Sequence, residues 1–166
     1  MNSITTNKDF FYSANIAKWY KLYNNQADWV DNEVVYSLNL GKTIVKEVTK
    51  TATQEFDFKI ETKNKDILNA YSFITKNKRE IINHLQVAGK VAIKPYLNGD
   101  RVLLSLVSAL DFKEKYDALG RLEKVYFKTD ISDGYTKYRL IEEHTQDYST
   151  NTYKIDYKLI KDNSSQ

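Results

Sequence analysis

The side chains that could bind a metal ion or transfer a proton are few in this chain. It holds two histidines and no cysteine, which excludes disulfides, thiolate ligands and a cysteine nucleophile. His144 shares one face of a predicted strand with Glu142, because alternate strand residues point the same way. For His84, on a predicted helix, we expect no histidine or carboxylate at ligand spacing. Since the usual metal sites need three or four ligands, we interpret both histidines as surface or hydrogen-bonded residues and predict no metal site.

One short segment is similar to the end of a phosphate-binding loop, Leu40-Gly41-Lys42-Thr43. That loop needs a glycine five residues before the second one, and Tyr36 occupies that position. The segment also falls inside a predicted helix. We find no nucleophile elbow, dinucleotide fingerprint or calcium loop, and we attribute the carboxylates of Asp100, Asp117 and Asp133 to turn chemistry. The sequence therefore predicts no enzyme, no catalytic residue and no cofactor.

Aromatic and basic side chains alternate in the C-terminal half and invite a nucleic-acid interpretation, with tyrosines to stack on bases and cations to contact phosphates. The set comprises Tyr126, Lys128, Tyr135, Lys137, Tyr138, Arg139, Tyr148, Tyr153, Lys154, Tyr157 and Lys158. The net charge is only +3 and acidic residues are interspersed. We therefore favour a tyrosine-rich face that packs on helices or on a neighbouring subunit, and we assign no nucleic-acid-binding residue.

Length and composition indicate a soluble globular protein. The chain has 166 residues, 42% of them hydrophobic and 28% charged, which predicts one domain with a real core. Residues 1–7 are polar, without the apolar core of a signal peptide. The most apolar stretch, 102–110, is too short to span a bilayer. These features predict a cytosolic setting without membrane contact.

Hydrophobic periodicity predicts about four helices in the N-terminal half. The first runs from about residue 10, with a stripe of Tyr12, Ile16, Trp19, Tyr20 and Tyr23, and we expect Trp29 after it to dock on the core. The second covers about 34–52, with a stripe of Leu40, Ile44, Val45 and Val48. The third opens at Asn64-Lys65-Asp66, and the fourth runs from an Asn77 cap to a C-terminal Gly89.

Strand patterns follow from Gly89 onward. They predict strands at 90–97, 101–108, about 122–129, 135–146 and 153–160, preceded by a short strand at about 56–61. Asn98-Gly99 predicts a type I′ hairpin turn, with positive φ at both residues. Pro95 lacks an amide hydrogen, so its strand should lie at an edge or contain a bulge. We expect a further hairpin turn at 130–134.

The predicted fold class is α+β. About four N-terminal helices (about 10–89) pack on one face of a mainly antiparallel meander of about five strands (about 90–160). We expect a single domain over 1–166, with flexible ends at 1–9 and 161–166.

The order of these elements resembles the N-terminal wing region of the portal proteins of tailed bacteriophages, in the branch with siphophage-type portals and minor capsid proteins. The clearest match is residues 87–96, then Asn98-Gly99-Asp100, then 107–112. Weaker matches lie at 17–23, 29, 38–47, 118–121, 138–144 and 153–155. The chain departs from the family pattern at Lys90, where a second glycine is common, and at Lys113, where a proline often follows.

The resemblance implies a structural role in the virion. Portal subunits form a ring, commonly of twelve, at one capsid vertex, and double-stranded DNA passes through its channel during packaging and ejection. The implied partners are other portal subunits, the major capsid protein, the scaffold, the terminase and the head–tail adaptor. The implied location is the portal vertex of the virion, and the host cytoplasm during assembly. Stem helices, clip and channel-lining loop lie outside the matching segments, so no DNA-contacting residue follows.

Overall fold

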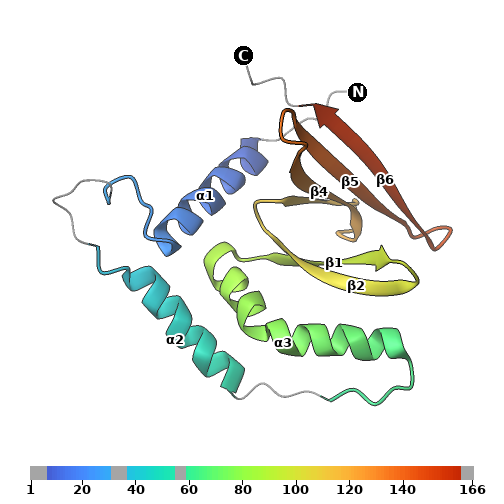
Figure 1. Ribbon diagram of the computed structural model, residues 1–166, viewed down its shortest axis with the longest axis horizontal. Coiled ribbons are helices and arrows are strands. Elements are labelled where there is room, and N and C mark those ends of the chain that lie inside the picture. The colour runs from blue at the N-terminus through green and yellow to red at the C-terminus, as the bar shows by residue number, and fades with distance from the viewer. Residues whose placement is uncertain (1–6, 31–36, 55–58, 162–166) are drawn as a thin grey trace. The chain divides into compact units, whose positions relative to one another are not determined.

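The computed structural model describes residues 7–30, 37–54 and 59–161, with the side chains from residue 14 onward. The chain divides into two compact units, Met1–Leu110 and Asp111–Gln166. The first unit contains α1 (Asn7–Tyr23), α2 (Leu40–Gln54), α3 (Lys65–Ala88), β1 (Val91–Asn98) and β2 (Arg101–Ser108). The second contains β3 (Phe112–Tyr116), β4 (Leu122–Ser132), β5 (Lys137–Asp147) and β6 (Thr152–Lys161) (Figure 1).

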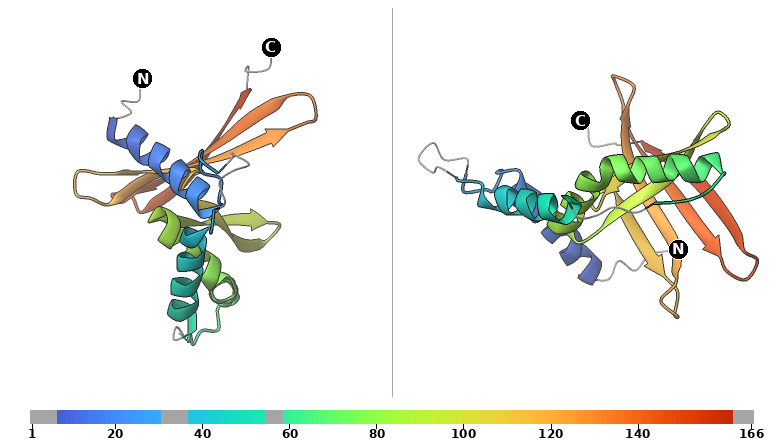
Figure 2. Two further views of the ribbon diagram at one scale, coloured as in Figure 1. Left: turned by 90° about the vertical axis from the view of Figure 1, so that its left-hand side faces the viewer. Right: turned by 90° about the horizontal axis from the view of Figure 1, so that it is seen from below.

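The α+β class is confirmed, with corrections to the counts and the sheets. The described residues form three helices rather than four, and six strands in two antiparallel sheets rather than one meander of about five. Helix α3 packs against both strands of the β1–β2 hairpin (Figure 2). Whether helices cover the β3–β6 sheet, and whether residues 1–166 form a single domain, stay predictions.

Helix α3 merges the third and fourth predicted helices. Its predicted start is confirmed, because the Asn64 side chain accepts hydrogen bonds from the backbone N–H groups of Asp66 and Ile67. Its predicted end is confirmed by Gly89, which adopts a φ of 73° and donates its N–H to the Leu85 carbonyl. The predicted cap at Asn77 is wrong. Asn77 lies within the helix and donates from its side chain to the Phe73 carbonyl, one turn back.

The stripe predicted for α2 faces away from its packing partner. Leu40, Ile44 and Val48 are exposed, whereas Thr49 and Thr53 are the buried residues of the helix. Because α2 packs on α3, these threonines form its inner face together with the half-buried Val45. The predicted inner stripe is therefore wrong for its other three members, Leu40, Ile44 and Val48. The start is also later than predicted: residues 37–39 precede the helix, and residues 34–36 lie outside the described residues.

Helix α1 and the segment after it agree with the predictions in part. Ile16 is buried, as predicted, whereas Trp19 is 39% exposed and Tyr12 lies outside the described side chains. Trp29 is 60% exposed, so its predicted docking on the core is wrong. In the predicted strand at 56–61, residues 56–58 lie outside the described residues and 59–61 are not in a strand.

The β1–β2 hairpin is confirmed, with a different turn. Asn98 pairs with Arg101, so the two loop residues are Gly99 and Asp100. Only Gly99 has positive φ, at 61°, which is the combination of a type II′ turn rather than the predicted type I′. Pro95 lies on an edge strand, as predicted, because the sheet has two strands and both are edges.

The second unit is a meander in the order β3-β4-β5-β6. Strand β3 was not predicted, because five residues bounded by turns carry little periodicity. Strand β4 continues through Ser132, so the predicted turn at 130–134 begins only at Asp133. Residues 7–9 belong to α1 and Lys161 belongs to β6, whereas the flexibility of the two ends stays a prediction. Within the described residues, no helix is long and apolar enough to cross a membrane.

Candidate functional site

The register of the β3–β6 sheet sorts its side chains onto two chemically different faces. Directly paired residues of antiparallel strands share a face, and Phe112, Phe127, Glu142 and Tyr157 form one such row across the four strands. We call this side the aromatic face: Phe112, Val125, Phe127, Ile131, Tyr138, Leu140, Glu142, His144, Tyr153, Ile155, Tyr157 and Leu159, together with the polar Glu114, Thr129, Gln146 and Lys161. We call the other side the charged face: Lys113, Lys115, Lys124, Tyr126, Lys128, Asp130, Lys137, Arg139, Glu143, Lys154, Asp156 and Lys158, together with the uncharged Ser132, Ile141, Thr145 and Ile160.

A chain of ring contacts crosses the aromatic face. Phe112 lies 6.2 Å from Phe127 between ring centroids, and Phe127 makes an edge-on contact of 4.9 Å with His144. His144 in turn contacts the Tyr153 ring edge-on at 5.8 Å. Edge-on geometry places the positive rim of one ring against the negative face of the next. These contacts link all four strands of the sheet.

Two polar side chains are buried in this row, Glu142 at 8% exposure and His144 at 3%. His144 Nδ1 is hydrogen-bonded to the Tyr153 hydroxyl, and His144 Nε2 lies 3.6 Å from a Glu142 carboxylate oxygen. Burial, and to a lesser extent the nearby Tyr157, raises the pKa of the Tyr153 phenol. The Tyr153 hydroxyl satisfies Nδ1 of the buried histidine, whereas the Glu142 carboxylate lies beyond hydrogen-bond distance of Nε2.

The predicted sharing of a face by Glu142 and His144 is confirmed. Their closest oxygen and nitrogen atoms are 3.6 Å apart, so the two side chains do meet. The described residues contain no group of three or more histidine or carboxylate side chains arranged to hold a metal ion. The arrangement fits a hydrogen-bonded structural histidine. Sequence reasoning missed Tyr153 as its partner, because that pairing depends on the β5–β6 register.

The other histidine, His84, is hydrogen-bonded, as we interpreted it, but the expected absence of a carboxylate at ligand spacing was wrong. Glu80 lies one helical turn before it, with a carboxylate oxygen 3.9 Å from His84 Nε2. His84 Nδ1 is 2.7 Å from the Tyr20 hydroxyl, and the two rings meet edge-on. This pair joins α1 to α3 inside the first unit. The hydrogen bond crosses between two helices, which indicates a role in packing.

Gly41-Lys42-Thr43 lies inside α2, as predicted, in the first turn of the helix. Asn39, with a φ of 46°, precedes the helix, and its side-chain oxygen accepts from the Lys42 N–H. That oxygen serves as the helix cap. Tyr36 lies outside the described residues, and residues 37–39 before the helix are not in a strand. A phosphate loop joins a strand to its helix, so the local structure does not match one.

The basic and aromatic residues considered for nucleic-acid binding separate between the two faces. Tyr138, Tyr153 and Tyr157 share the aromatic face, whereas the lysines, Arg139 and Tyr126 share the charged face. Tyr135 and Tyr148 lie in turns, outside the strands. A site for single-stranded nucleic acid combines stacking residues and phosphate-binding cations on one surface. In this sheet most of the tyrosines and the cations lie on opposite faces.

Several cations of the charged face are held in ion pairs. Arg139 Nε lies 2.8 Å from an Asp130 oxygen, and Lys154 Nζ lies 2.9 Å from Asp156. Lys124 donates to Glu143, and this hydrogen bond raises the pKa of Lys124. The eight cations of this face still outnumber its three carboxylates, so it keeps a net positive charge.

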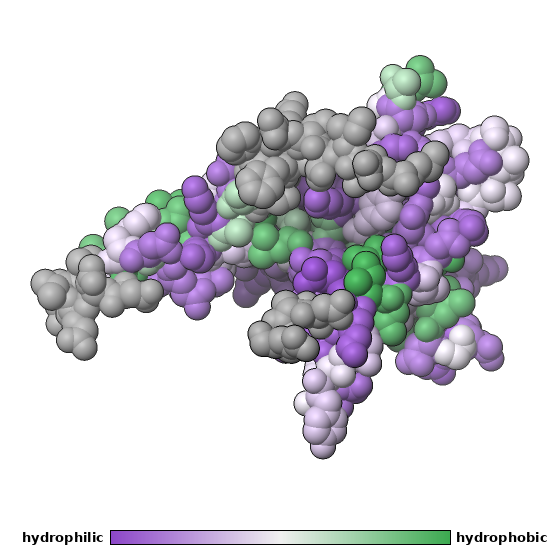
Figure 3. Space-filling model, turned by 90° about the horizontal axis from the view of Figure 1, so that it is seen from above, coloured by the Kyte–Doolittle hydropathy of each residue, from purple (hydrophilic) through white to green (hydrophobic). Residues whose placement is uncertain are grey.

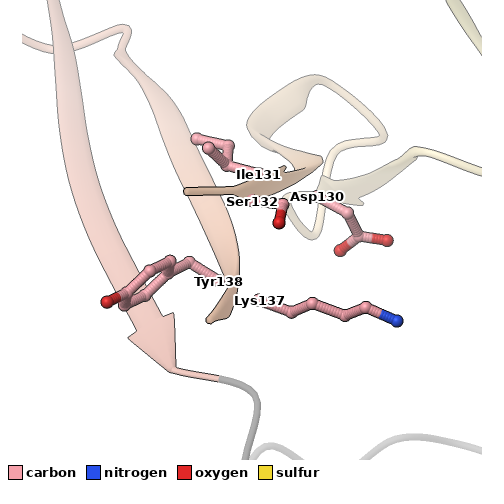
Figure 4. A pocket seen from close by; sticks show the side chains of 5 residues that line it. All are labelled: Asp130, Ile131, Ser132, Lys137 and Tyr138. Atoms are coloured by element: carbon pink, nitrogen blue, oxygen red, sulfur yellow. The ribbon is translucent and has the colours of Figure 1, made fainter. Parts of the chain in front are cut away.

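A pocket lies at the β4–β5 hairpin, lined by Asp130, Ile131, Ser132, Lys137 and Tyr138 (Figure 4). Its side chains do not converge. Figure 4 shows the Tyr138 ring and the Lys137 chain extending in opposite directions from the strand. Asp130 is already paired with Arg139. A ligand site normally combines an apolar lining with several polar groups aimed at one point, which this pocket lacks.

The turn carboxylates serve the turns, as predicted for Asp117 and Asp133. Asp117 accepts from the backbone N–H groups of Leu119 and Arg121, and Asp133 accepts from those of Tyr135 and Thr136. These bonds hold the pKa of both carboxyls below its ordinary value.

No family model matches the chain, and no curated protein matches it either.

Proposed function

We propose that the chain is a structural component of a tailed-phage virion, the wing segment of a portal ring through which DNA is packaged and ejected. The proposal rests on the resemblance of residues 87–112 to portal wings and on apolar surface that a structural subunit would cover with its neighbours. The role needs no catalytic residue and no cofactor.

The observation that carries the proposal is the aliphatic stripe on α2. Leu40, Ile44 and Val48 follow one another at successive turns, and Ile44 is 63% exposed. Hydrophobic patches also reach the surface elsewhere among hydrophilic side chains (Figure 3). Contiguous apolar surface on a soluble protein marks a site of protein–protein contact. A neighbouring portal subunit is the partner that the family resemblance supplies.

The residues that carry the resemblance serve backbone geometry. Gly89 ends α3 in the left-handed conformation, and Gly99 turns the hairpin with positive φ. The last of the three clearest matching segments, 107–112, includes Phe112, which is buried in the aromatic row of the second unit. Use of the motif for caps, turns and packing supports a scaffold role over a ligand-binding one.

The proposal is tested by producing the chain together with the residues that follow it in its gene. We expect a ring of about twelve subunits in electron micrographs and in native mass spectra, and a terminase gene nearby. An extended protein that stays monomeric and carries no long helices would contradict the assignment.

DNA binding separates this function from the alternative, an independent nucleic-acid-binding module. A wing segment should bind DNA weakly, and any binding should vanish at moderate salt. A module that neutralises several phosphates would bind tightly, with a steep dependence of affinity on salt concentration. Fluorescence anisotropy with a labelled duplex and a labelled single strand, over a range of salt, measures the difference.

A further inference from the structure

Strand β6 is an open edge of the four-stranded sheet. Among the residues that the structure describes, it pairs with β5 alone, and all ten of its residues are exposed. Its side on the aromatic face carries Tyr153, Ile155, Tyr157 and Leu159, and Tyr157 is 66% exposed. An exposed edge of this length presents unpaired backbone N–H and C=O groups to another strand. Side-chain pattern then decides which strand fits.

The pattern of β6 is complementary to itself. Two antiparallel copies keep their aromatic faces on the same side only when the two-fold axis passes through a residue, since a one-residue slip exchanges the faces. With the axis at Tyr157, Asp156 lies opposite Lys158 of the second copy, and Ile155 lies opposite its Leu159. Opposite charges and aliphatic pairs placed directly across strands are stabilising.

Neighbouring registers are less favourable. An axis at Asp156 opposes that carboxylate to itself and Lys154 to Lys158 of the second copy. An axis at Lys158 opposes two ammonium groups. An axis at Ile155 also pairs unlike charges, but it engages only residues 152–158, whereas the Tyr157 axis engages 153–161. Like charges placed directly opposite destabilise a strand pair.

The other edge of the sheet, β3, fits β6 poorly. It carries Lys113 and Lys115 on the charged face. Every antiparallel register that pairs all of β3 with β6 and keeps the faces aligned sets one of these lysines opposite Lys154 or Lys158. The partner selected by charge is therefore a second β6.

Within one chain, Asp156 sits beside another carboxylate. In the strand register Asp156 lies directly opposite Glu143 of β5, and Lys154 Nζ lies 2.9 Å from an Asp156 carboxylate oxygen. Glu143 is itself engaged by Lys124. A lysine from a second copy would add a favourable contact where two acidic side chains adjoin.

We propose that β6 is a homotypic docking edge, on which two copies of this chain join antiparallel about a two-fold axis at Tyr157 into an eight-stranded sheet. A two-fold contact closes on itself, so it is distinct from the head-to-tail contacts of a ring. The proposal goes beyond the proposed function and does not depend on it. The strand pair is smaller than a standard interface, so the dimer should be weak and form at about 10 μM to 1 mM.

The test uses charge reversal and sedimentation equilibrium of the full chain over that concentration range. Asp156→Lys places like charges opposite each other at two positions, and Lys158→Asp does the same with carboxylates. Each variant alone should weaken dimerisation about tenfold or more. An equimolar mixture of the two should form a heterodimer, because each lysine then meets an aspartate. Lys113→Asp, on the β3 edge, is the matched control and should leave the dimer unchanged.

Circular dichroism of each variant establishes that it is folded, and the mixture provides a second check, because misfolded chains would not regain association. A wild-type chain that stays monomeric at about 1 mM would overturn the proposal. So would a dimer that both reversals leave intact, a mixture that fails to associate, or a dimer that Lys113→Asp disrupts. The last outcome would place β3 at the contact instead.

Discussion

The inner face of α2 gives a sharp test of how the helical part is packed. Thr49 is 3% exposed, and its hydroxyl donates to the Asn83 side-chain oxygen of α3 at 2.7 Å. Val48, the next residue along the helix, is 42% exposed. Hydrophobic periodicity predicts the opposite, a buried Val48 and an exposed Thr49. Two isosteric substitutions, Thr49→Val and Val48→Thr, therefore distinguish the structure from the pattern.

The magnitudes follow from the two environments. Thr49→Val removes the hydroxyl and leaves the Asn83 oxygen without that donor, which costs about 1–3 kcal/mol, partly offset by the added methyl group. We expect a net loss of about 1–2 kcal/mol in the free energy of unfolding. Val48→Thr changes a side chain already in contact with water, so its effect should be within about 0.5 kcal/mol.

Urea unfolding followed by far-ultraviolet circular dichroism measures both differences. The denaturant slope should be the same in all three proteins, so that a shift in midpoint reports stability alone. Asn83→Ala combined with Thr49→Val completes a double-mutant cycle, in which the hydroxyl–amide pair should show a coupling energy of about 1 kcal/mol. If Val48→Thr proved more costly than Thr49→Val, α2 would pack through its aliphatic stripe, and the structural reasoning would be refuted.

Three further substitutions test a helix cap, the hydrogen bond to a buried histidine and a turn carboxylate. Gly89→Ala should cost about 1 kcal/mol in urea unfolding, because alanine tolerates the left-handed conformation poorly. Tyr153→Phe should cost about 1 kcal/mol by removing the hydroxyl that bonds His144, and it should reduce the loss of stability above pH 10. The raised pKa of Tyr153 makes its contribution complete below the unfolded pKa of about 10 and lost as pH rises through the folded pKa. Asp147 has a pKa of about 2, lowered first by the hydroxyls of Ser149 and Thr150, so its contribution is present above pH 3.8 and lost as pH falls through about 2. Asp147→Asn should therefore flatten the fall in melting temperature between those two values.

Features set by adjacent residues could be predicted from the sequence. Side-chain type directly restricts the conformation of a few neighbouring residues. This was enough to predict the start of α3 at Asn64, its end at Gly89 and the edge position of the strand that contains Pro95. The type of the hairpin turn was harder. Asn98-Gly99 satisfies the turn rule, but pairing of Asn98 with Arg101 moved the loop one residue along.

Features set by distant partners could not be predicted. Asn77 followed by Glu80 has the form of a capping box, yet α3 continues through both because no competing signal ends the preceding turns. The threonine face of α2 is buried because Asn83, far along the chain, offers Thr49 a hydrogen-bond partner. Periodicity measures which face is more apolar, and a good polar partner can outweigh that difference.

The sheet shows how far alternation reaches and where register takes over. Alternation alone places Glu142 and His144 on one face, and the structure confirms that they meet. It cannot tell which residue of β6 stands next to His144, since the length of the turn before Thr152 sets that pairing. The same register separates the tyrosines from most of the lysines. The favoured prediction, a tyrosine-rich face, fits this arrangement, whereas the alternative of one mixed surface keeps only Tyr126 among the lysines.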